Sequence, residues 1–390
     1  MKSLNRPFFI LQALAITIQA IAVSFLSTIL VRYGFPSSRI GLTFTLAALG
    51  CMLSKPLLGA LGDRAACSRA LTLVLMLFGS GCYVALVFCP DLPPLLLALA
   101  VLDYVAICSA TAVIDSWSMR LIHDGYEINY GLTRSAGSLF YAIASIIIGQ
   151  VMEQYGPKPC VPALIVLLIA LFVTVRFLPD PTLTLRPTDR VSLPDGLSRL
   201  SRNRIYCLTL LGFFLAQLSS ASGDSFLSVR VITELGGTEA DMGRVFFLQA
   251  ISEVPILILF RTIRRRFHLP LHILLAFSAF VFGFKPLCFG LAHSPTAIVL
   301  LSLMNGLSFG IYVTAIVDFV LETVEERYLA TGQLVFGAIG QGMGNMVGNL
   351  ACGVVADRIG AGNMMICFSI FGMLGALIIL FGTRRKEKMI

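Results

Sequence analysis

Charged residues are scarce in this chain. Only 13% of its 390 residues are Asp, Glu, Lys or Arg, about half the share found in a typical soluble domain. Hydrophobic residues make up 57% of the sequence, and the mean hydropathy is +0.88. Since so few charges cannot cover a water-exposed surface, the composition excludes an ordinary soluble globule and predicts a polytopic membrane protein.

The residue patterns that indicate catalysis or metal binding are also missing. The ten cysteines are scattered through or beside apolar runs without a C-x-x-C pair, as small buried hydrophobes would be. No Ser–His–Asp arrangement, catalytic carboxylate pair or zinc-ligand spacing falls within one run or loop. We therefore expect no enzymatic activity, no metal and no cofactor other than a coupling ion.

Twelve apolar runs, each long enough to cross a bilayer, are separated by charged, Pro or Gly positions. The runs are 7–33, 38–62, 70–89, 94–120, 130–153, 160–178, 204–230, 241–261, 268–291, 295–321, 328–356 and 361–382. One long polar and Pro-rich segment, residues 179–204, separates the sixth run from the seventh. The sequence thus predicts an all-α membrane protein of twelve transmembrane helices in two pseudo-symmetric six-helix bundles. The predicted domains are an N-terminal bundle, 1–178, a cytoplasmic linker, 179–203, and a C-terminal bundle, 204–390.

The basic residues are distributed unevenly between alternate loops. The net charge of +8 would favour a nucleic-acid partner in a soluble protein, but most Lys and Arg residues here lie in short segments between apolar runs. With a cytoplasmic N-terminus, twenty of the 29 basic residues fall on the cytoplasmic side and six outside. The positive-inside rule therefore predicts a multi-pass inner-membrane protein with both termini cytoplasmic, in contact with lipids and not with nucleic acid. The Arg264–Arg266 cluster is expected to fix topology and touch anionic headgroups.

Two further patterns concern helix packing. The octapeptide GQVMEQYG at 149–156 is echoed by GVVADRIG at 353–360, an offset of 204 residues. Duplication of a six-helix unit explains the echo, and internal repeats are characteristic of secondary transporters. Gly340, Gly344 and Gly348 recur at four-residue spacing, which predicts close helix packing; no strand precedes them and no Lys follows, as a phosphate-binding loop would require.

Ionisable residues inside the apolar runs are the main functional signal. Arg134 lies in such a run, where an Arg costs roughly 2.5 to 3.5 kcal/mol on membrane-insertion scales, so it should face a partner or a water-filled cavity. Asp115 lies at a similar predicted depth on the preceding helix, and the pair is either part of a solute site or a structural ion pair. Glu253 and Lys285 are likewise intramembrane, and they form either a proton-coupling pair or a permanently ionised brace.

The segment GALGDRAACSR at 59–69 resembles the signature loop of the major facilitator superfamily, with Gly59, Asp63, Arg64 and Arg69 in the matching places. The resemblance implies a cytoplasmic latch in which the carboxylate meets a helix N-terminus and the arginines hold neighbouring loops. A merely solvated tight turn is the alternative.

Within that superfamily, the chain resembles over its whole length the lactose permease group of oligosaccharide and phenylpropionate proton symporters. YGLTRSAGSLFY at 130–141 is similar to the helix-five segment of that group, which implies that Arg134 contacts the solute and that Tyr141 stacks on a sugar ring. Tyr141 stands where lactose permease has a tryptophan. VIDSWSMR is similar to the helix-four segment whose carboxylate partners that arginine, which places Asp115 in this role.

In the second half, ISEVPILIL and FGFKPLCFG resemble the helix-eight and helix-nine segments of the same group, matching Glu253 and Lys285 to functional positions. Asp224, in SSASGDSF, is a further intramembrane carboxylate. Helix ten departs from the group, since Asn305 and Ser308 stand where lactose permease has a histidine and a glutamate, and neither titrates near neutral pH. Glu253 is therefore the candidate for the coupling proton, within reach of Lys285.

Together with the intramembrane charges, these resemblances imply a monomeric secondary active transporter that imports a small polar solute, a sugar, nucleoside or aromatic acid, with protons by alternating access. The expected roles are solute binding by Asp115, Arg134, Tyr141 and Asn305, proton coupling by Glu253, Lys285 and Asp224, and gating by Gly59, Asp63, Arg64 and Arg69. An exporter or uniporter of the same fold, or a non-transporting membrane sensor or scaffold, are the alternatives.

Overall fold

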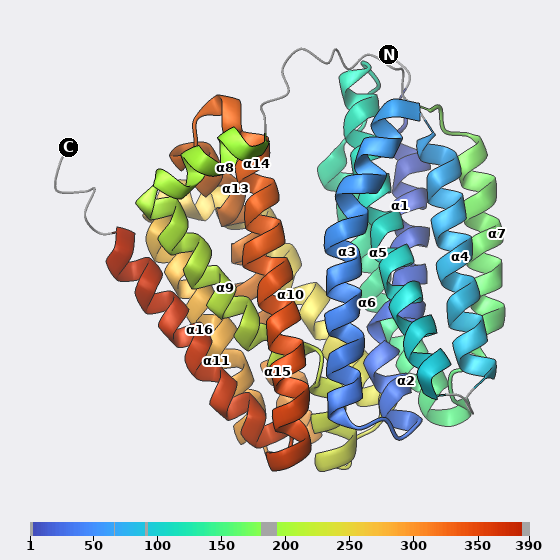
Figure 1. Ribbon diagram of the computed structural model, residues 1–390. Coiled ribbons are helices and arrows are strands. Elements are labelled where there is room, and N and C mark those ends of the chain that lie inside the picture. Colours follow the sequence, from blue (N-terminus) through green and yellow to red (C-terminus); the bar gives the residue numbers. More distant parts are fainter. Residues whose placement is uncertain (1–2, 66, 90–92, 181–192, 384–390) are drawn as a thin grey trace. The chain divides into compact units, whose positions relative to one another are not determined.

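A computed structural model describes residues 3–65, 67–89, 93–180 and 193–383, and for some of these, Gly59–Ala65 among them, only the backbone. Helices account for nearly all of it, and no β-strand occurs in the described ranges (Figure 1). The α-helices are α1 Asn5–Gln19, α2 Leu26–Arg32, α3 Ser37–Ala65, α4 Ser68–Phe88, α5 Pro93–His123, α6 Tyr130–Tyr155, α7 Cys160–Arg176, α8 Leu193–Arg202, α9 Arg204–Asp224, α10 Glu239–Arg266, α11 Leu271–Leu291, α12 Pro295–Leu301, α13 Ile311–Thr323, α14 Leu329–Val335, α15 Gly344–Ile359 and α16 Ala361–Thr383.

Internal contacts divide the chain into two compact units. The first unit comprises Met1–Phe35, Leu46–Leu185 and Thr238–Ala250, and the second comprises Pro36–Thr45, Arg186–Gly237 and Ile251–Ile390. In the first unit α4 packs on α5 and α1 packs on α6; in the second, α9 and α16 both pack on α11. Residues of α3 and α10 belong to both units. The predicted division into two bundles at 178 and 204 stays a prediction.

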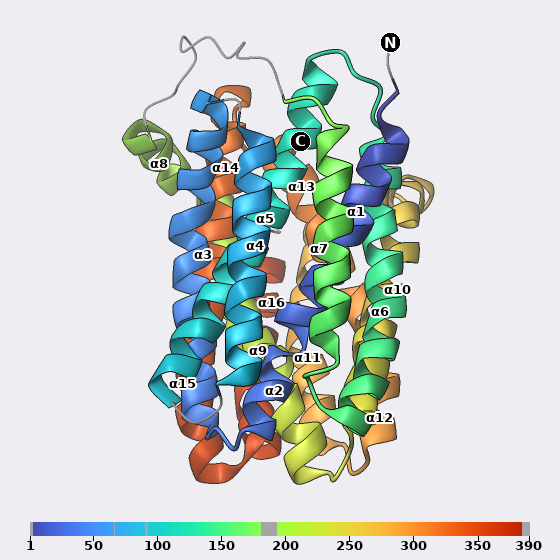
Figure 2. The ribbon, with the colours of Figure 1, turned by 90° about the vertical axis from the view of Figure 1, so that its right-hand side faces the viewer.

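The helices agree in position with the predicted apolar runs. In the part of the chain that is described, nine helices or continuous helical stretches are long and apolar enough to cross a membrane, and Cys160–Arg176 is a shorter apolar helix. The remaining predicted runs coincide with α3 and with the stretch from α14 to α15. The all-helical membrane fold is therefore confirmed, while the count of twelve spans stays a prediction. Figure 2 shows these long helices from a second direction.

The distribution of side chains is that of a membrane protein. Large apolar side chains such as Val166, Ile258 and Phe381 are more than 60% exposed, whereas Lys285 and Asp103 are fully buried. Water would disfavour so much exposed apolar surface, but lipid does not. These helices accordingly suit a hydrocarbon surrounding, in which the backbone polar groups are satisfied within each helix.

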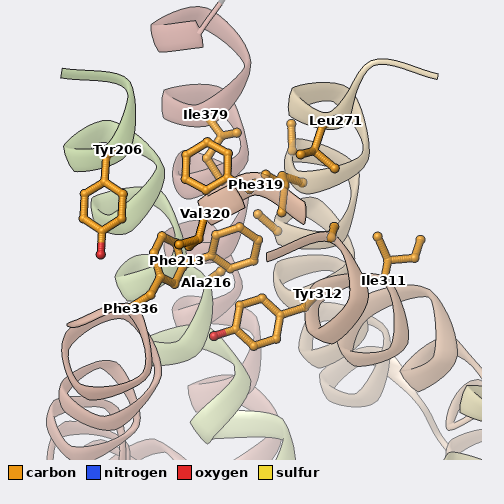
Figure 3. Close-up of a cluster of buried hydrophobic side chains, with 14 of the residues drawn as sticks. Tyr206, Phe213, Ala216, Leu271, Ile311, Tyr312, Phe319, Val320, Phe336 and Ile379 are labelled. Carbon is orange, nitrogen blue, oxygen red and sulfur yellow. The ribbon is translucent and has the colours of Figure 1, made fainter. Parts of the chain in front are cut away.

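An aromatic cluster forms the core of the second unit at one end of its helices (Figure 3). Phe213 of α9 lies 4.8 Å from Tyr312 and 5.8 Å from Phe336, measured between ring centroids. Tyr206, about two turns before Phe213 on the same face of α9, donates a hydrogen bond from its hydroxyl to the Gly332 carbonyl at 2.7 Å. This bond satisfies the polar tip of a buried ring, so the cluster fixes α9 against α13 and α14.

Two of the three glycines at four-residue spacing pack closely against another helix, as the spacing predicts. A Cβ built on Gly344 or Gly348 of α15 would come within 2.7 Å of the Phe214 or Leu218 carbonyl oxygen of α9. Only glycine permits this approach of two helix backbones. Gly340 meets side chains only, at 3.3 Å or more. Close packing is thus confirmed, and α9 is the partner.

The repeated octapeptide has the same local structure in both places. Its last residue, Gly156 or Gly360, ends a helix with a positive φ of 76° or 83°, a conformation that favours glycine. Its first residue, Gly149 or Gly353, approaches the backbone of a second helix, at Gly243 or Gly41 respectively. The two segments therefore share a helix end and a glycine-to-glycine crossing, which is consistent with duplication.

We predict that Gly372→Ala lowers the stability of the second unit by about 1 to 3 kcal/mol, the usual effect of overpacking. A Cβ on Gly372 of α16 would lie 2.5 Å from the backbone of Gly283 of α11, and backbone atoms cannot move aside. Gly337→Ala is the matched control, because no atom lies within 4 Å of its Cβ. Thermal unfolding of both variants in detergent tests the prediction; equal midpoints would contradict it.

Candidate functional site

Asp115 of α5 and Arg134 of α6 are brought close together in the first unit. Asp115 accepts a hydrogen bond from Gln12 Nε2 of α1 at 2.7 Å. It also interacts electrostatically with Arg134, and the Tyr130 hydroxyl is within hydrogen-bonding reach of both side chains. Asp115 is half-buried and Arg134 is exposed. The predicted proximity is confirmed, and three helices contribute to this group.

Tyr141 has a defined polar partner in the same unit. Its hydroxyl donates to Ser24 Oγ at 2.9 Å. Ser24 ends a π-helical segment, Ala20–Ser24, between α1 and α2, and such segments occur often at functional sites. Tyr141 lies seven residues after Arg134 on α6, so both occupy roughly one face of that helix.

Lys285 of α11 is the most deeply buried cation of the second unit among the described residues. Its side chain is fully buried, and its Nζ lies 2.8 Å from Asp224 Oδ1 and 3.0 Å from Asn305 Oδ1. Asp224 ends α9, where it also accepts a hydrogen bond from Ser220 Oγ at 2.5 Å. Its own side chain is 47% exposed. The ion pair therefore joins a buried ammonium to a carboxylate that reaches the solvent-accessible surface.

Asn305 links this ion pair to Glu253. Its Nδ2 donates to Glu253 Oε1 of α10 at 2.7 Å, while its Oδ1 accepts from Lys285. Lys285 therefore pairs with Asp224, and the amide of Asn305 bonds both Lys285 and Glu253. An amide can do so because it offers a donor and an acceptor at once. The predicted direct pair of Glu253 and Lys285 stays a prediction.

Two helix irregularities position the chain of polar groups. Pro286 follows Lys285 and has no N–H, so the carbonyl of Phe282 loses its helical donor. Ser219 Oγ of α9 donates to that carbonyl at 3.3 Å, which ties α9 to α11 beside the ion pair. Asn305 itself immediately precedes a π-helical segment, Gly306–Gly310, whose first N–H bonds Ser252 Oγ of α10 at 3.0 Å.

Part of the predicted signature loop can be located. Arg69, at the start of α4, donates its backbone N–H to Asp180 Oδ1 at 3.0 Å and its Nη2 to the Leu178 carbonyl. It therefore fastens α4 to the segment that follows α7. Only the backbone is described for Gly59, Asp63 and Arg64, so the predicted latch stays a prediction.

Sequence reasoning missed several members of these groups. Gln12 and Ser24 are polar residues in an apolar run, a weak signal that many neutral residues share. Arg264 was expected at the lipid headgroups, yet its guanidinium pairs with Asp318 at 2.9 Å and with Glu322 at 2.5 Å. A glutamate four residues after an aspartate on α13 could have indicated such a clamp, since both face one side of a helix.

Comparison with known proteins gives the family. The family model described as the MFS_1 like family matches residues 16–367. Uncharacterized transporter YwbF of Bacillus subtilis (strain 168) is 23% identical over 344 residues, covering 88% of this chain and 84% of the relative. The maltose permease of Geobacillus stearothermophilus is 25% identical over 279 residues, covering 70% and 68%.

Solved transporters share the fold. The nucleoside transporter NupG superposes with a TM-score of 0.76 at 15% identity, covering 98% of this chain and 99% of that one. A POT family transporter in complex with 5-aminolevulinic acid gives a TM-score of 0.75 at 13% identity, covering 97% and 96%. The resemblance to the major facilitator superfamily is confirmed. The chain belongs to the MFS_1 like family and is a membrane transporter of the major facilitator type, not an enzyme.

Proposed function

We propose that this transporter imports a small polar solute together with protons by alternating access. The observation that carries the proposal is the connected chain of Asp224, Lys285, Asn305 and Glu253, which draws on α9, α10, α11 and the junction between α12 and α13. Intramembrane ionisable groups are expensive to keep and mark ion or proton pathways by default. A carboxylate joined to a buried ammonium through a single amide can pass a change of protonation to the ion pair.

Arg134, Asp115 and Tyr141 are the proposed solute-binding residues of the first unit, and Asn305 that of the second. Guanidinium, carboxylate and phenol groups offer donors and acceptors for hydroxyl groups, and the phenol ring offers a face for a sugar or base. A relative named maltose permease supports a sugar as the first solute to test. Nucleosides and aromatic acids suit the same side chains and are the second and third solute classes to test.

Transport into proteoliposomes with an imposed pH gradient tests the proposal. With an acidic exterior, we expect labelled maltose, a nucleoside or an aromatic acid to accumulate, and a protonophore to abolish the accumulation. Equilibration without accumulation would support a uniporter instead. Efflux driven by an acidic exterior would support an exporter, and protein-free vesicles give the background.

We predict that Arg134→Ala weakens solute binding by about tenfold or more, because hydrogen bonds to a charged group contribute about 1.5 to 3 kcal/mol each. Arg176→Ala is the control, since Arg176 ends α7 and lies over the Phe172 ring. Ligand-induced thermal shifts across the three solute classes, measured on both variants, give the affinities. A ligand whose shift survives Arg134→Ala would remove Arg134 from the solute site.

A further inference from the structure

Asp103 is a buried carboxylate that the proposed mechanism does not use. It lies on α5, within a membrane-spanning helix, and its exposure is 0%. Within the described part of the chain, neither of its carboxylate oxygens has a hydrogen-bond partner. Buried polar groups in proteins are almost always hydrogen-bonded, so two orphaned oxygens on one fully buried acid require an explanation.

The surroundings of Asp103 are the interface of α5 with α4. Gly79 of α4 lies against Ala106 and Ile107, which follow Asp103 by about one helical turn. Cys82 and Tyr83, one turn beyond Gly79 in the antiparallel helix, are near enough to interact electrostatically with Asp103. Tyr83 is itself fully buried. The carboxyl is therefore enclosed by side chains that carry no positive charge.

The other titratable groups near Asp103 are also neutral or distant. Cys108 of α5 interacts with Asp103 and with Cys51 and Lys55 of α3, but Lys55 makes no ion pair or resolved interaction with Asp103. The neighbours of Tyr83 are the Cys160 thiol and Tyr33. Arg6, the cation of α1, begins that helix near the far end of α5, about 30 Å away at the helical rise. No cation among the described residues is placed to neutralise an ionised Asp103.

These observations set the protonation state. An ionised carboxylate in a low-dielectric interior is strongly disfavoured unless it is paired and hydrogen-bonded, whereas the neutral acid avoids most of that penalty. We propose that Asp103 is a proton-binding site at the α4–α5 interface, occupied by a proton in this conformation. A metal cation fits less well, because the described residues contain no group of three or more His, Cys, Asp or Glu side chains that could hold one.

Proton release and the packing of α4 on α5 are linked. Ionised Asp103 needs water or a counter-charge, and neither can reach it while Ala106 and Ile107 remain packed on Gly79. A conformation that separates α4 from α5 therefore favours loss of the proton, and a bound proton favours their closure. This site lies in the first unit, whereas the proposed coupling group Glu253 lies in the second.

Infrared spectroscopy of the purified full-length protein in detergent tests the proposal. We expect the wild type at neutral pH to show a carboxylic-acid carbonyl band that Asp103→Asn lacks. Asp318→Asn is the matched control, because Asp318 forms ion pairs with Arg261 and Arg264, and it should leave the band intact. Retention of the band in Asp103→Asn, or its absence from the wild type, overturns the proposal. Loss of the band on replacing choline chloride with sodium chloride would show a cation as the occupant and also overturn it.

The pH dependence of stability gives a second readout. If the folded state holds a proton that the unfolded state releases, stability falls as the pH rises. The wild type should therefore lose more stability between pH about 5 and about 8 than Asp103→Asn, which cannot titrate there. Parallel stability profiles would overturn the proposal. Should Asp103→Asn fail to fold, Asp103→Glu keeps the acid and is expected to shift the carbonyl band; an unshifted band would count against Asp103.

Discussion

Asp224→Asn is expected to destabilise the protein by about 3 kcal/mol, the lower end of the range for breaking a buried ion pair, because Asp224 is itself partly exposed. The substitution removes the carboxylate that pairs with Lys285, whose side chain is fully buried. The ammonium would keep only neutral acceptors, the amide oxygen introduced at position 224 and Asn305 Oδ1 at 3.0 Å. Thermal unfolding in detergent, followed by far-ultraviolet circular dichroism, measures the loss of stability.

A double variant separates the stranded charge from other effects. Asp224→Asn combined with Lys285→Met removes both charges and should recover much of the lost stability, since a well-packed apolar replacement of a buried pair is often neutral or stabilising. Ser220→Ala, which deletes only the hydroxyl that bonds Asp224, should cost about 1 kcal/mol. If the double variant is no more stable than Asp224→Asn alone, the ion pair is not what holds α9 and α11 together here.

One energetic argument identifies the candidate residues: a charged side chain within an apolar run costs free energy in the membrane, so it is expected to have a partner or a function. It located Arg134, Asp115, Glu253 and Lys285, and the structure places each of them on a membrane-spanning helix. The same energetic argument applies to Asp103, which lies within the predicted run 94–120.

The sequence predicts which charges lie within the membrane better than it predicts which partners they contact. Helix periodicity places Lys285 at a depth, but its partner depends on how α11 is rotated against α9 and α10. Asn305 decides the outcome here, because its amide satisfies Lys285 and Glu253 together. A neutral amide gives no energetic signal in a sequence, so the contacts of Asn305 with both Lys285 and Glu253 could not be predicted from it. By contrast, the depth argument for Asp115 and Arg134 needed only adjacent antiparallel helices and succeeded.

The glycine spacing likewise predicts close packing but not the partner helix. The four-residue spacing of Gly344 and Gly348 predicts a close helix approach, and the structure has one. The identity of the partner, α9, could not follow from the spacing, because any helix with an accessible backbone would satisfy it. Local sequence therefore predicted which surfaces pack closely, and only tertiary structure showed what they pack against.

Glu253→Gln is expected to abolish solute accumulation driven by a pH gradient while leaving solute exchange intact. Glutamine keeps an oxygen that can accept the hydrogen bond from Asn305 Nδ2, now 2.7 Å from Glu253 Oε1, so the local packing should survive. It cannot bind or release a proton, so the link from proton to Lys285 through Asn305 is lost. One pH unit is equivalent to about 1.4 kcal/mol, or about tenfold accumulation for one proton per solute, and that whole factor should disappear.

Two measurements on the same proteoliposomes distinguish lost coupling from lost transport. Accumulation is measured with an acidic exterior, and counterflow is measured with solute on both sides and no gradient. Glu326→Gln is the matched control, since Glu326 begins a short exposed turn after α13 and should change neither rate. Asn305→Ala breaks the link while leaving Glu253 titratable, but Asn305 is also a proposed solute-binding residue, so this variant should lower both accumulation and counterflow. Gradient-driven accumulation that persists in Glu253→Gln would exclude Glu253 as the coupling group, and the proton-binding site proposed at Asp103 would then be the next carboxyl to test by the same pair of assays.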